Sequence, residues 1–279
     1  MMMVLPAALI YAVFLLYPII ETVLLSLNEW MGIGPKRFVG LRNYIAAFHD
    51  NLVFKSFLNN IIYTIGVIIL GVLVGLIVAV LLARKLRGRV LFETIFFLPR
   101  LLAMVVVAVV WGWIFNPHIG LTVRIFNAIG MKSLAVGWLG TFQLAMFAIV
   151  IAGSWTYFGF CMIIFMAALQ STDESLSEAA LIDGANQFQI FYKITLPQIS
   201  NAITLVIMVS VIDSFKLFDL IWVMTQGGPG DATHILATHL YREAFRHNHF
   251  GYAATIAVLL TILVLGFSLV FQQLREKEN

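Results

Sequence analysis

Six long apolar segments alternate with shorter polar stretches along this chain of 279 residues. A helix needs about 20 residues to cross the roughly 30 Å hydrocarbon core of a bilayer, and each segment reaches that length. The pattern therefore predicts an all-α integral membrane protein with six transmembrane helices, near residues 4–27, 57–83, 94–115, 141–169, 200–224 and 252–274. We expect residues 1–279 to form a single transmembrane domain.

The composition supports a membrane protein and excludes several other classes. Hydrophobic residues make up 61% and charged residues 11% of the chain, with a mean hydropathy of +0.97. Soluble domains carry about 25% charged residues. The net charge is only +3, and the basic residues form no stripe of the kind that binds nucleic acid, so we expect no nucleic acid partner. The single cysteine, Cys161, excludes a disulfide framework and a cysteine zinc site.

The longest polar interruption in the second half of the chain, residues 170–197, predicts a short helical hairpin. Residues 171–174 and 175–178 both fit the Ser-x-x-Glu capping box that begins a helix. Asp173 and Glu174 suit the positive end of the helix dipole. Gly184 can end this helix in a left-handed conformation, and Asn186 can cap a second helix that leads to Pro197. On local pattern alone, the hairpin could simply join two membrane helices.

The spacing within this hairpin is more specific. The spacing begins with Glu178-Ala179-Ala180, followed after three residues by Gly184. After nine more residues come Ile194 and, one residue further on, Leu196-Pro197. The sequence resembles the EAA loop of permease subunits in binding-protein-dependent ABC importers. The resemblance implies that this coupling loop lies in the cytoplasm and docks into a groove on a separate ATPase subunit. The coupling residues it implies are Glu178, Ala179, Ala180, Asp183 and Gly184.

Three further segments resemble carbohydrate-uptake permeases of the maltose and glycerol-phosphate type. They are F-x-G-L-x-N-Y at 38–44, W-x-W-x-F-N-P at 111–117, and T-x-G-G-P at 225–229 followed by Y-x-x-A-F at 241–245. The resemblance implies a sugar or related polyol as solute, a second homologous permease, two ATPase subunits and an extracytoplasmic solute-binding protein. The chain itself has no P-loop, so ATP and Mg²⁺ would bind the partner ATPase and no cofactor is expected here. It also lacks G-x-S-x-G and H-E-x-x-H motifs, so we expect a transporter subunit and not an enzyme.

The charges predict the topology. A short basic loop follows the second segment and carries Arg84, Lys85, Arg87 and Arg89. Short loops rich in lysine and arginine stay in the cytoplasm. Residues 28–56 also carry four basic residues, so this argument is local. Alternation then places both termini and the 170–197 loop inside, in a multi-pass protein of a bacterial or archaeal cytoplasmic (inner) membrane.

Polar and aromatic residues within two segments are candidates for the solute path. In the fourth segment they are Ser154, Thr156, Tyr157 and Phe160. Hydroxyl groups can bond a sugar and aromatic rings can pack on its C–H faces, although the same residues also suit helix packing. In the fifth segment they are Asp213, Ser214, Lys216 and Leu217. Charges within a membrane are costly and usually face a bundle interior or a wet cavity.

Alternatives remain open at this stage. Asp213, Lys216 and Asp219 recur every three residues, so one helix face could hold them as a structural ion pair. Together with Glu21 they could instead carry protons in an ion-coupled secondary transporter, but that function leaves the EAA motif unexplained. His247-Asn248-His249 suggests a metal, yet no Cys, Asp or Glu follows at ligand spacing, so we expect none. Arg100 is expected to snorkel to the cytoplasmic surface.

Overall fold

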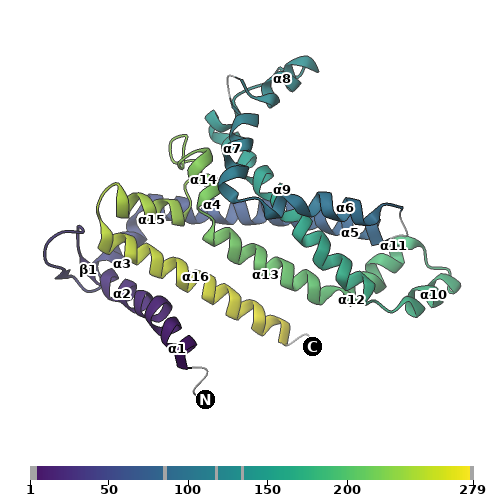
Figure 1. Ribbon diagram of the computed structural model, residues 1–279, viewed down its shortest axis with the longest axis horizontal. Coiled ribbons are helices and arrows are strands. Elements are labelled where there is room, and N and C mark those ends of the chain that lie inside the picture. The colour runs from purple at the N-terminus through teal and green to yellow at the C-terminus, as the bar shows by residue number, and fades with distance from the viewer. Residues whose placement is uncertain (1–4, 84–86, 117–118, 133–134, 277–279) are drawn as a thin grey trace. The chain divides into compact units, whose positions relative to one another are not determined.

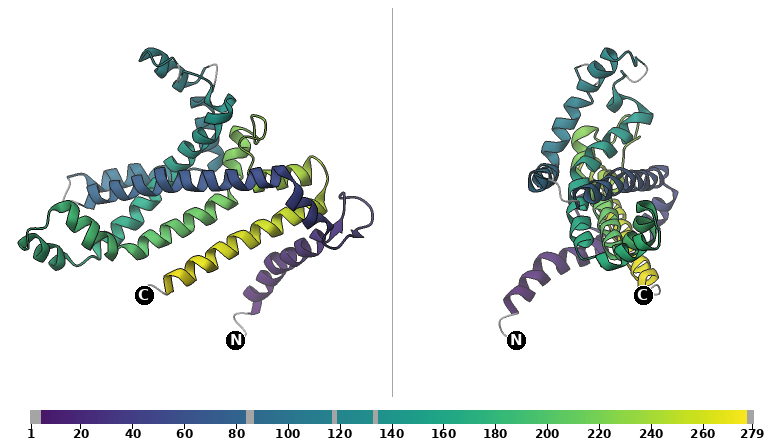
Figure 2. Two further views of the ribbon diagram at one scale, coloured as in Figure 1. Left: turned by 180° about the vertical axis from the view of Figure 1, so that it is seen from behind. Right: turned by 90° about the vertical axis from the view of Figure 1, so that its right-hand side faces the viewer.

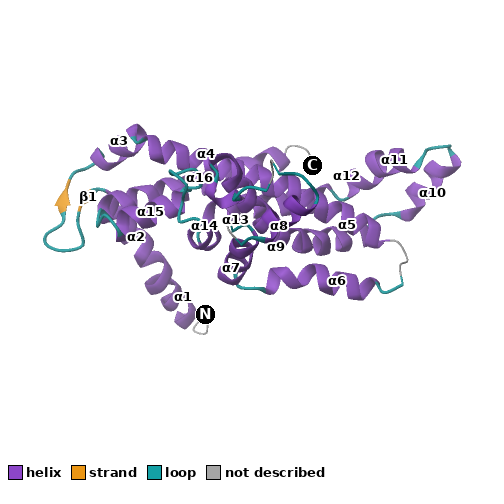
Figure 3. Ribbon diagram, turned by 90° about the horizontal axis from the view of Figure 1, so that it is seen from above, coloured by secondary structure: helices purple, strands orange, loops and turns teal. Residues whose placement is uncertain are grey.

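A computed structural model describes residues 5–83, 87–116, 119–132 and 135–276. Helices dominate the described chain, and Figure 3 shows one small strand pair beside them. Within the described residues, four helices are long and apolar enough to cross a membrane, or six if each of two bent helix pairs counts as one span. The expectation of an all-α protein with six spans is therefore confirmed when each bent helix pair is counted as one span.

The chain forms two compact units, which we describe separately. Unit 1 comprises Met1–Asn60, Phe215–Phe218 and Gln226–Asn279, and unit 2 comprises Ile61–Ser214 and Asp219–Thr225. The single transmembrane domain stays a prediction. Of the basic residues that predicted the topology, Arg84 and Lys85 lie outside the described residues, as does Pro117 of the W-x-W-x-F-N-P segment.

Unit 1 is built around the last helix of the chain. That helix, α16 (Phe250–Glu276), packs against α2 (Tyr17–Ser26), α3 (Arg42–His49) and α15 (Leu236–Phe245), and Figure 1 shows α2, α15 and α16 as neighbours. The remaining elements of unit 1 are α1 (Leu5–Tyr11), the π-turn η1 (Ala12–Leu16), the antiparallel strands β1 (Asn28–Glu29) and β2 (Arg37–Phe38), and the start of α4 (Asn51–Val67).

The F-x-G-L-x-N-Y segment fastens the loop after the first span to the end of α2. The side-chain amide of Asn43 donates to the carbonyl oxygens of Ser26 and Asn28, both at 3.0 Å. The hydroxyls of Tyr44 and Ser26 lie 2.6 Å apart. Thr255 of α16 donates to the same Ser26 carbonyl at 3.1 Å. This motif therefore has a structural explanation: it joins three elements at one buried serine.

Unit 2 is built around α9 (Phe142–Gln170). The helix contacts η2 (Ile68–Val72), α5 (Leu73–Ala83), α6 (Arg89–Phe97), η3 (Leu98–Leu101), α7 (Met104–Ile114) and η4 (Trp138–Gly140). Figure 2 shows the chain from two further directions. The remaining elements are α8 (Leu121–Ala128), α10 (Glu174–Ile182), α11 (Gln187–Ile190), η5 (Phe191–Thr195), α12 (Leu196–Gln198), α13 (Ser200–Lys216), most of which belongs to this unit, and α14 (Asp219–Met224).

Small residues let α5 approach α9 closely. A Cβ atom on Gly75 would lie 2.6 Å from Cys161 Cβ and 2.8 Å from the Phe158 carbonyl oxygen. Only glycine fits such a contact between helix backbones. Gly71 has more room, since its nearest neighbour, Tyr157, would lie 3.5 Å away. Gly71 and Gly75, four positions apart, therefore both face α9, and Gly75 allows the closest approach.

Two of the six predicted spans are not single helices. The third changes direction by 97° between Arg89–Leu101 and Met104–Ile114, as Figure 1 shows for α6 and α7. Pro99 explains the end of α6, because proline lacks the N–H group that continues a helix. In place of the fifth, the second bent pair joins Gln187–Gln198 to Ser200–Lys216 at 68°, and α14 begins separately at Asp219. The expectation that Asp213, Lys216 and Asp219 share one helix face is therefore wrong for Asp219.

Candidate functional site

The predicted coupling hairpin is present, but its first cap differs from the prediction. Helix α10 begins at Glu174, and Asp173 is its N-cap, accepting a hydrogen bond from the Ser175 backbone N–H at 2.9 Å. Hydrogen bonds from Ser175 lower the pKa of Asp173. The two predicted Ser-x-x-Glu boxes are wrong for a local reason. The Ser171 hydroxyl donates to the Ala168 carbonyl at 2.8 Å, so it serves the end of α9 instead.

The turn of the hairpin forms as the sequence predicts. Gly184 has φ of +87°, the left-handed conformation that glycine adopts without strain. The Gly184 N–H donates to Leu181 O at 3.1 Å and the Ala185 N–H to Ala180 O at 2.9 Å, the bond pattern of a Schellman motif. Asn186 then caps α11 in a reciprocal capping box with Gln189, with both bonds at 2.9 Å.

The base of the hairpin is closed by one side chain. Gln198, the last residue of α12, accepts a hydrogen bond from the Asp173 backbone N–H through Oε1 at 2.8 Å. Asp173 lies just after the end of α9, and one residue, Ile199, separates Gln198 from the start of α13. The bond therefore joins the two points where the hairpin leaves and re-enters the helices of unit 2, at the end where Figure 1 labels α10, α11 and α12.

The hairpin exposes large apolar side chains. Ile182 is 87% exposed, Phe188 76% and Tyr192 63%, and the rings of Phe188 and Tyr192 stack with centroids 6.4 Å apart. Of the predicted coupling residues, Glu178, Ala179, Asp183 and Gly184 are exposed and Ala180 is partly buried. A hollow of about 220 Å³ lies between α11–η5 and the ends of α5 and α9, lined in part by Ala83, Leu169 and Ile190. Large exposed apolar side chains of this kind suit a surface where another molecule binds.

The solute-path candidates meet at a charged and aromatic cluster in unit 2. The guanidinium of Arg100 lies 3.3 Å from the Asp213 carboxylate. The same guanidinium lies 5.4 Å from the ring centroid of Tyr157 and 5.2 Å from that of Phe160, which is cation–π distance. Tyr157 donates from its hydroxyl to the Val206 carbonyl at 3.4 Å. Arg100 therefore contacts other candidates and does not simply snorkel; its role was missed because its partners are distant in sequence.

The other candidates have different surroundings. Thr156 is buried and suits packing, because its hydroxyl donates to the Gly153 carbonyl of its own helix at 2.8 Å. Ser154 is also buried, but its hydroxyl has no hydrogen-bond partner among the described residues. Ser214 is also buried. Lys216 and Leu217 belong to unit 1, whereas Arg100, Tyr157, Phe160 and Asp213 all belong to unit 2. The structure therefore brings together three predicted path residues with Arg100.

The chain matches the family described as binding-protein-dependent transport system inner membrane component over residues 71–275. The matched region is well over half of the 279 residues. The chain belongs to this permease family.

Three similar proteins bear out the family and the fold. The osmoprotective compounds uptake permease protein GgtC of Synechocystis sp. is 37% identical over 270 residues, covering 95% of this chain and 94% of GgtC. The trehalose/maltose transport system permease protein MalF of Thermococcus litoralis is 32% identical over 271 residues, covering 97% and 91%. The crystal structure of a bacterial ABC transporter that imports the acidic polysaccharide alginate contains a chain with a TM-score of 0.84, 20% identity, and coverage of 99% and 94%.

Membership in the permease family decides between the functions left open by the sequence. The chain is a multi-pass permease subunit of an ABC importer and not itself an enzyme. The ion-coupled secondary transporter is not favoured. Glu21, one of the residues that suggested it, lies 3.4 Å from Lys36 in a partly exposed ion pair.

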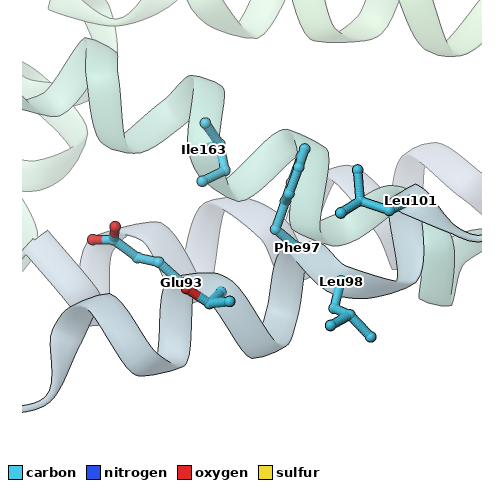
Figure 4. Close-up of a pocket in the computed structure, with 6 residues that line it drawn as sticks. Glu93, Phe97, Leu98, Leu101 and Ile163 are labelled. Carbon is cyan, nitrogen blue, oxygen red and sulfur yellow. The ribbon is translucent and has the colours of Figure 1, made fainter.

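This permease has a small apolar hollow whose lining includes none of the predicted path residues. Figure 4 shows it between α6–η3 and α9, lined by Glu93, Thr94, Phe97, Leu98, Leu101 and Ile163. Its one charged lining residue, Glu93, already pairs with Arg89. Its chemistry does not suit a polar solute.

A polar network surrounds the T-x-G-G-P and Y-x-x-A-F segments of the permease in unit 1. The side chain of Asn59 donates to the His234 carbonyl at 2.8 Å, and Asn60 accepts from the Leu236 N–H at 3.0 Å. Arg242 donates to Asp231 at 2.9 Å. Burial and the positive charge of Arg242 lower the pKa of His234 to about 4. These contacts hold the loop before α15, and Arg242 of the Y-x-x-A-F segment takes part in them.

Proposed function

We propose that residues 170–197 transmit the motion of an ATPase to the membrane helices of this permease. The separate ATPase would bind ATP and Mg²⁺. The hairpin offers exposed apolar side chains, including Ile182 and Phe188, that a partner groove could bury. Glu178 would make polar contacts in the groove, Ala179 and Ala180 would allow close approach, and Gly184 sets the turn. Asp183 is the exposed C-cap beside that glycine.

The solute path, in this proposal, runs past the cluster of Arg100, Tyr157, Phe160 and Asp213. The observation that carries it is the Arg100–Asp213 pair lying across two aromatic rings. A guanidinium and a carboxylate can exchange their mutual bond for bonds to sugar hydroxyls, and aromatic rings can pack on the sugar's C–H faces. The charges are only partly buried, with side chains 31% and 44% exposed, so neither is sealed in the interior. Ser154, Thr156, Ser214, Lys216 and Leu217 are secondary candidates.

The solute would be a sugar or a related polyol. The names of the relatives support this class, since one is a trehalose/maltose permease and another takes up osmoprotective compounds. The cluster carries one positive and one negative charge, which suits a neutral polyhydroxylated solute better than a strongly charged one. In alternating access, ATP binding would open the path outward, and hydrolysis would open it inward.

The assembly would contain a second homologous permease, two ATPase subunits and an extracytoplasmic solute-binding protein in a bacterial or archaeal inner membrane. Both termini would be cytoplasmic. One contact supports that topology: the end of α2 meets the start of α16, with the Thr255 hydroxyl bonding the Ser26 carbonyl at 3.1 Å. The end of α2 therefore meets the start of α16, and the two packed helices have antiparallel chain directions, so the start of α2 and the end of α16 lie on the same side.

A mild-detergent purification of the complete chain from its native membrane, followed by mass spectrometry, tests this assembly. We expect a P-loop ATPase and a second six-span permease to copurify. Recovery of the chain alone, even after cross-linking in the membrane, would contradict the proposal. A transport assay in proteoliposomes completes the test, because ATP depletion should stop uptake while a protonophore should not.

A further inference from the structure

Three potential metal ligands converge where α15 leads into α16 in unit 1. Nδ1 of His247 lies 2.9 Å from one carboxylate oxygen of Glu243, and Nδ1 of His249 lies 2.9 Å from the other. One ligand atom from each of the three residues lies within 4.8 Å of the other two. The expectation of no metal at His247-Asn248-His249 considered only the residues after His249. Glu243 precedes the pair by one helical turn.

We propose that Glu243, His247 and His249 bind a first-row divalent transition metal ion, such as Zn²⁺. Imidazole nitrogens and a carboxylate oxygen are ligands that such ions prefer. Ligand atoms about 2.0–2.1 Å from a tetrahedral ion lie about 3.3 Å apart. Each histidine contacts a different carboxylate oxygen at 2.9 Å, and the three ligand atoms lie within 4.8 Å of one another, so the two half-exposed rings would have to turn toward one shared position to bind an ion. Three protein ligands would leave the fourth position to water.

The backbone holds the three ligands in place without a metal. The His249 N–H donates to the Glu243 carbonyl at 2.8 Å, and the His247 N–H to the Arg242 carbonyl at 3.1 Å. Asn248 between them has φ of +59°, a conformation that asparagine tolerates better than most residues. The turn therefore directs both rings toward one carboxylate, which is itself largely buried.

The two nearby arginines have other partners. Arg242 donates to Asp231 at 2.9 Å, and Arg246 donates to Gln226 at 2.9 Å. The metal would add a bond between the end of α15 and the start of α16. Its role would be to stabilise this connection, so the inference does not depend on the proposed coupling or solute path.

Zinc titration of the complete permease tests the site, using protein purified in detergent with a tag that contains no histidine. A chromophoric chelator would compete for Zn²⁺, and Co²⁺ would report tetrahedral coordination through its visible absorption. We expect one Zn²⁺ per chain. His249→Ala should weaken binding by more than about 100-fold, since even residues that only orient a ligand contribute 10–100-fold.

The controls separate a metal site from a hydrogen-bonded turn. His49→Ala removes an exposed histidine from α3 and should leave binding unchanged. His247→Ala should match His249→Ala, while Glu243→Gln keeps the size of the buried side chain and removes its charge. A wild-type chain that takes up no Zn²⁺, or His247 and His249 variants that bind it as tightly as wild type, would overturn the proposal.

Discussion

The guanidinium of Arg100 lies 3.3 Å from the carboxylate of Asp213, although the two residues are 113 positions apart. Arg100 reaches this position because α6 gives way to the 3-10 turn η3 just before the chain bends by 97°. The bend in the third apolar segment therefore brings a basic residue to an acidic residue of α13, beside two aromatic rings of α9.

Neutralising this pair should impair transport. We expect Asp213→Asn or Arg100→Gln to reduce solute uptake in proteoliposomes at least tenfold, which corresponds to about 1.4 kcal/mol. Each change leaves one partly exposed charge without its partner, and removes one group that could bind sugar hydroxyls. Asp219→Asn is the matched control, because this carboxylate is exposed at the start of α14. Uptake at the wild-type level in both variants would remove Arg100 and Asp213 from the path.

Gly184→Val should uncouple the permease without unfolding it. A β-branched residue at φ of +87° costs about 1–2 kcal/mol, and this cost falls on the turn between α10 and α11. Gly130→Val is a matched control, because Gly130 also has positive φ, at +78°, with open space for a Cβ atom. We expect only Gly184→Val to lose copurifying ATPase while membrane insertion persists. Equal ATPase recovery from both variants would contradict the assigned role.

Ile182 should contribute to ATPase docking through its exposed side chain. Ile182→Ser removes apolar surface that is 87% exposed in the chain, so its own stability should hardly change. Ile33→Ser provides the control, because Ile33 is 91% exposed in the β1–β2 loop. Quantitative copurification should give reduced ATPase recovery for Ile182→Ser alone. If the two variants recover the same amount, the exposed hairpin surface is not the docking site.

The two glycines of α5 and η2 should respond differently to alanine. Gly75→Ala forces a methyl group to within 2.8 Å of the Phe158 carbonyl oxygen and should destabilise the protein by about 1–3 kcal/mol. Gly71→Ala meets only ordinary contacts at 3.5 Å and should be neutral or slightly stabilising, because alanine favours helix. Thermal unfolding in detergent measures both, and a lower Tm for Gly71→Ala than for Gly75→Ala would contradict this packing.

His234 should make stability depend on pH in acid. Burial, with Arg242, lowers its folded-state pKa to about 4 from a model-peptide value near 6.5. The unfolded chain therefore binds a proton between these values that the folded chain does not, so stability falls as pH falls from about 6.5 to 4. Asp231 favours the protonated form, whereas Lys55 and His239 oppose it. Tm measured across this range should vary less in His234→Gln; an unchanged slope would assign the dependence to other groups.

The hairpin and the unbroken spans were predictable because their signals are local. The fourth span was expected at residues 141–169, and α9 occupies Phe142–Gln170. Gly184 and Asn186 ended one helix and began the next as expected, because each acts through its own backbone conformation and nearby N–H groups. The first cap was misassigned because four capping residues compete between 171 and 175, and the first two, Ser171 and Thr172, bond carbonyls at the end of α9 instead.

The rest depended on contacts that no local pattern contains. The apolar pattern predicts which residues lie in the bilayer but not whether the helix they form is bent. Only Pro99 indicated the bend in the third segment. No proline or glycine marks the break after Lys216. The pairing of Arg100 with Asp213 required both of these segments to be placed in three dimensions. Glu243 was missed because ligands were sought only after the histidines.

The hydrogen bond from Asp173 to Gln198 has a mechanical consequence. If the two ends of the hairpin were not joined to each other, a force on the hairpin could rotate it about one end without moving both membrane helices. The two ends of the hairpin are joined by this 2.8 Å hydrogen bond. A displacement of the hairpin should therefore move the end of α9 and the start of α13 together. These are the two helices that carry Tyr157, Phe160 and Asp213, so one displacement reaches both sides of the cluster at the same time.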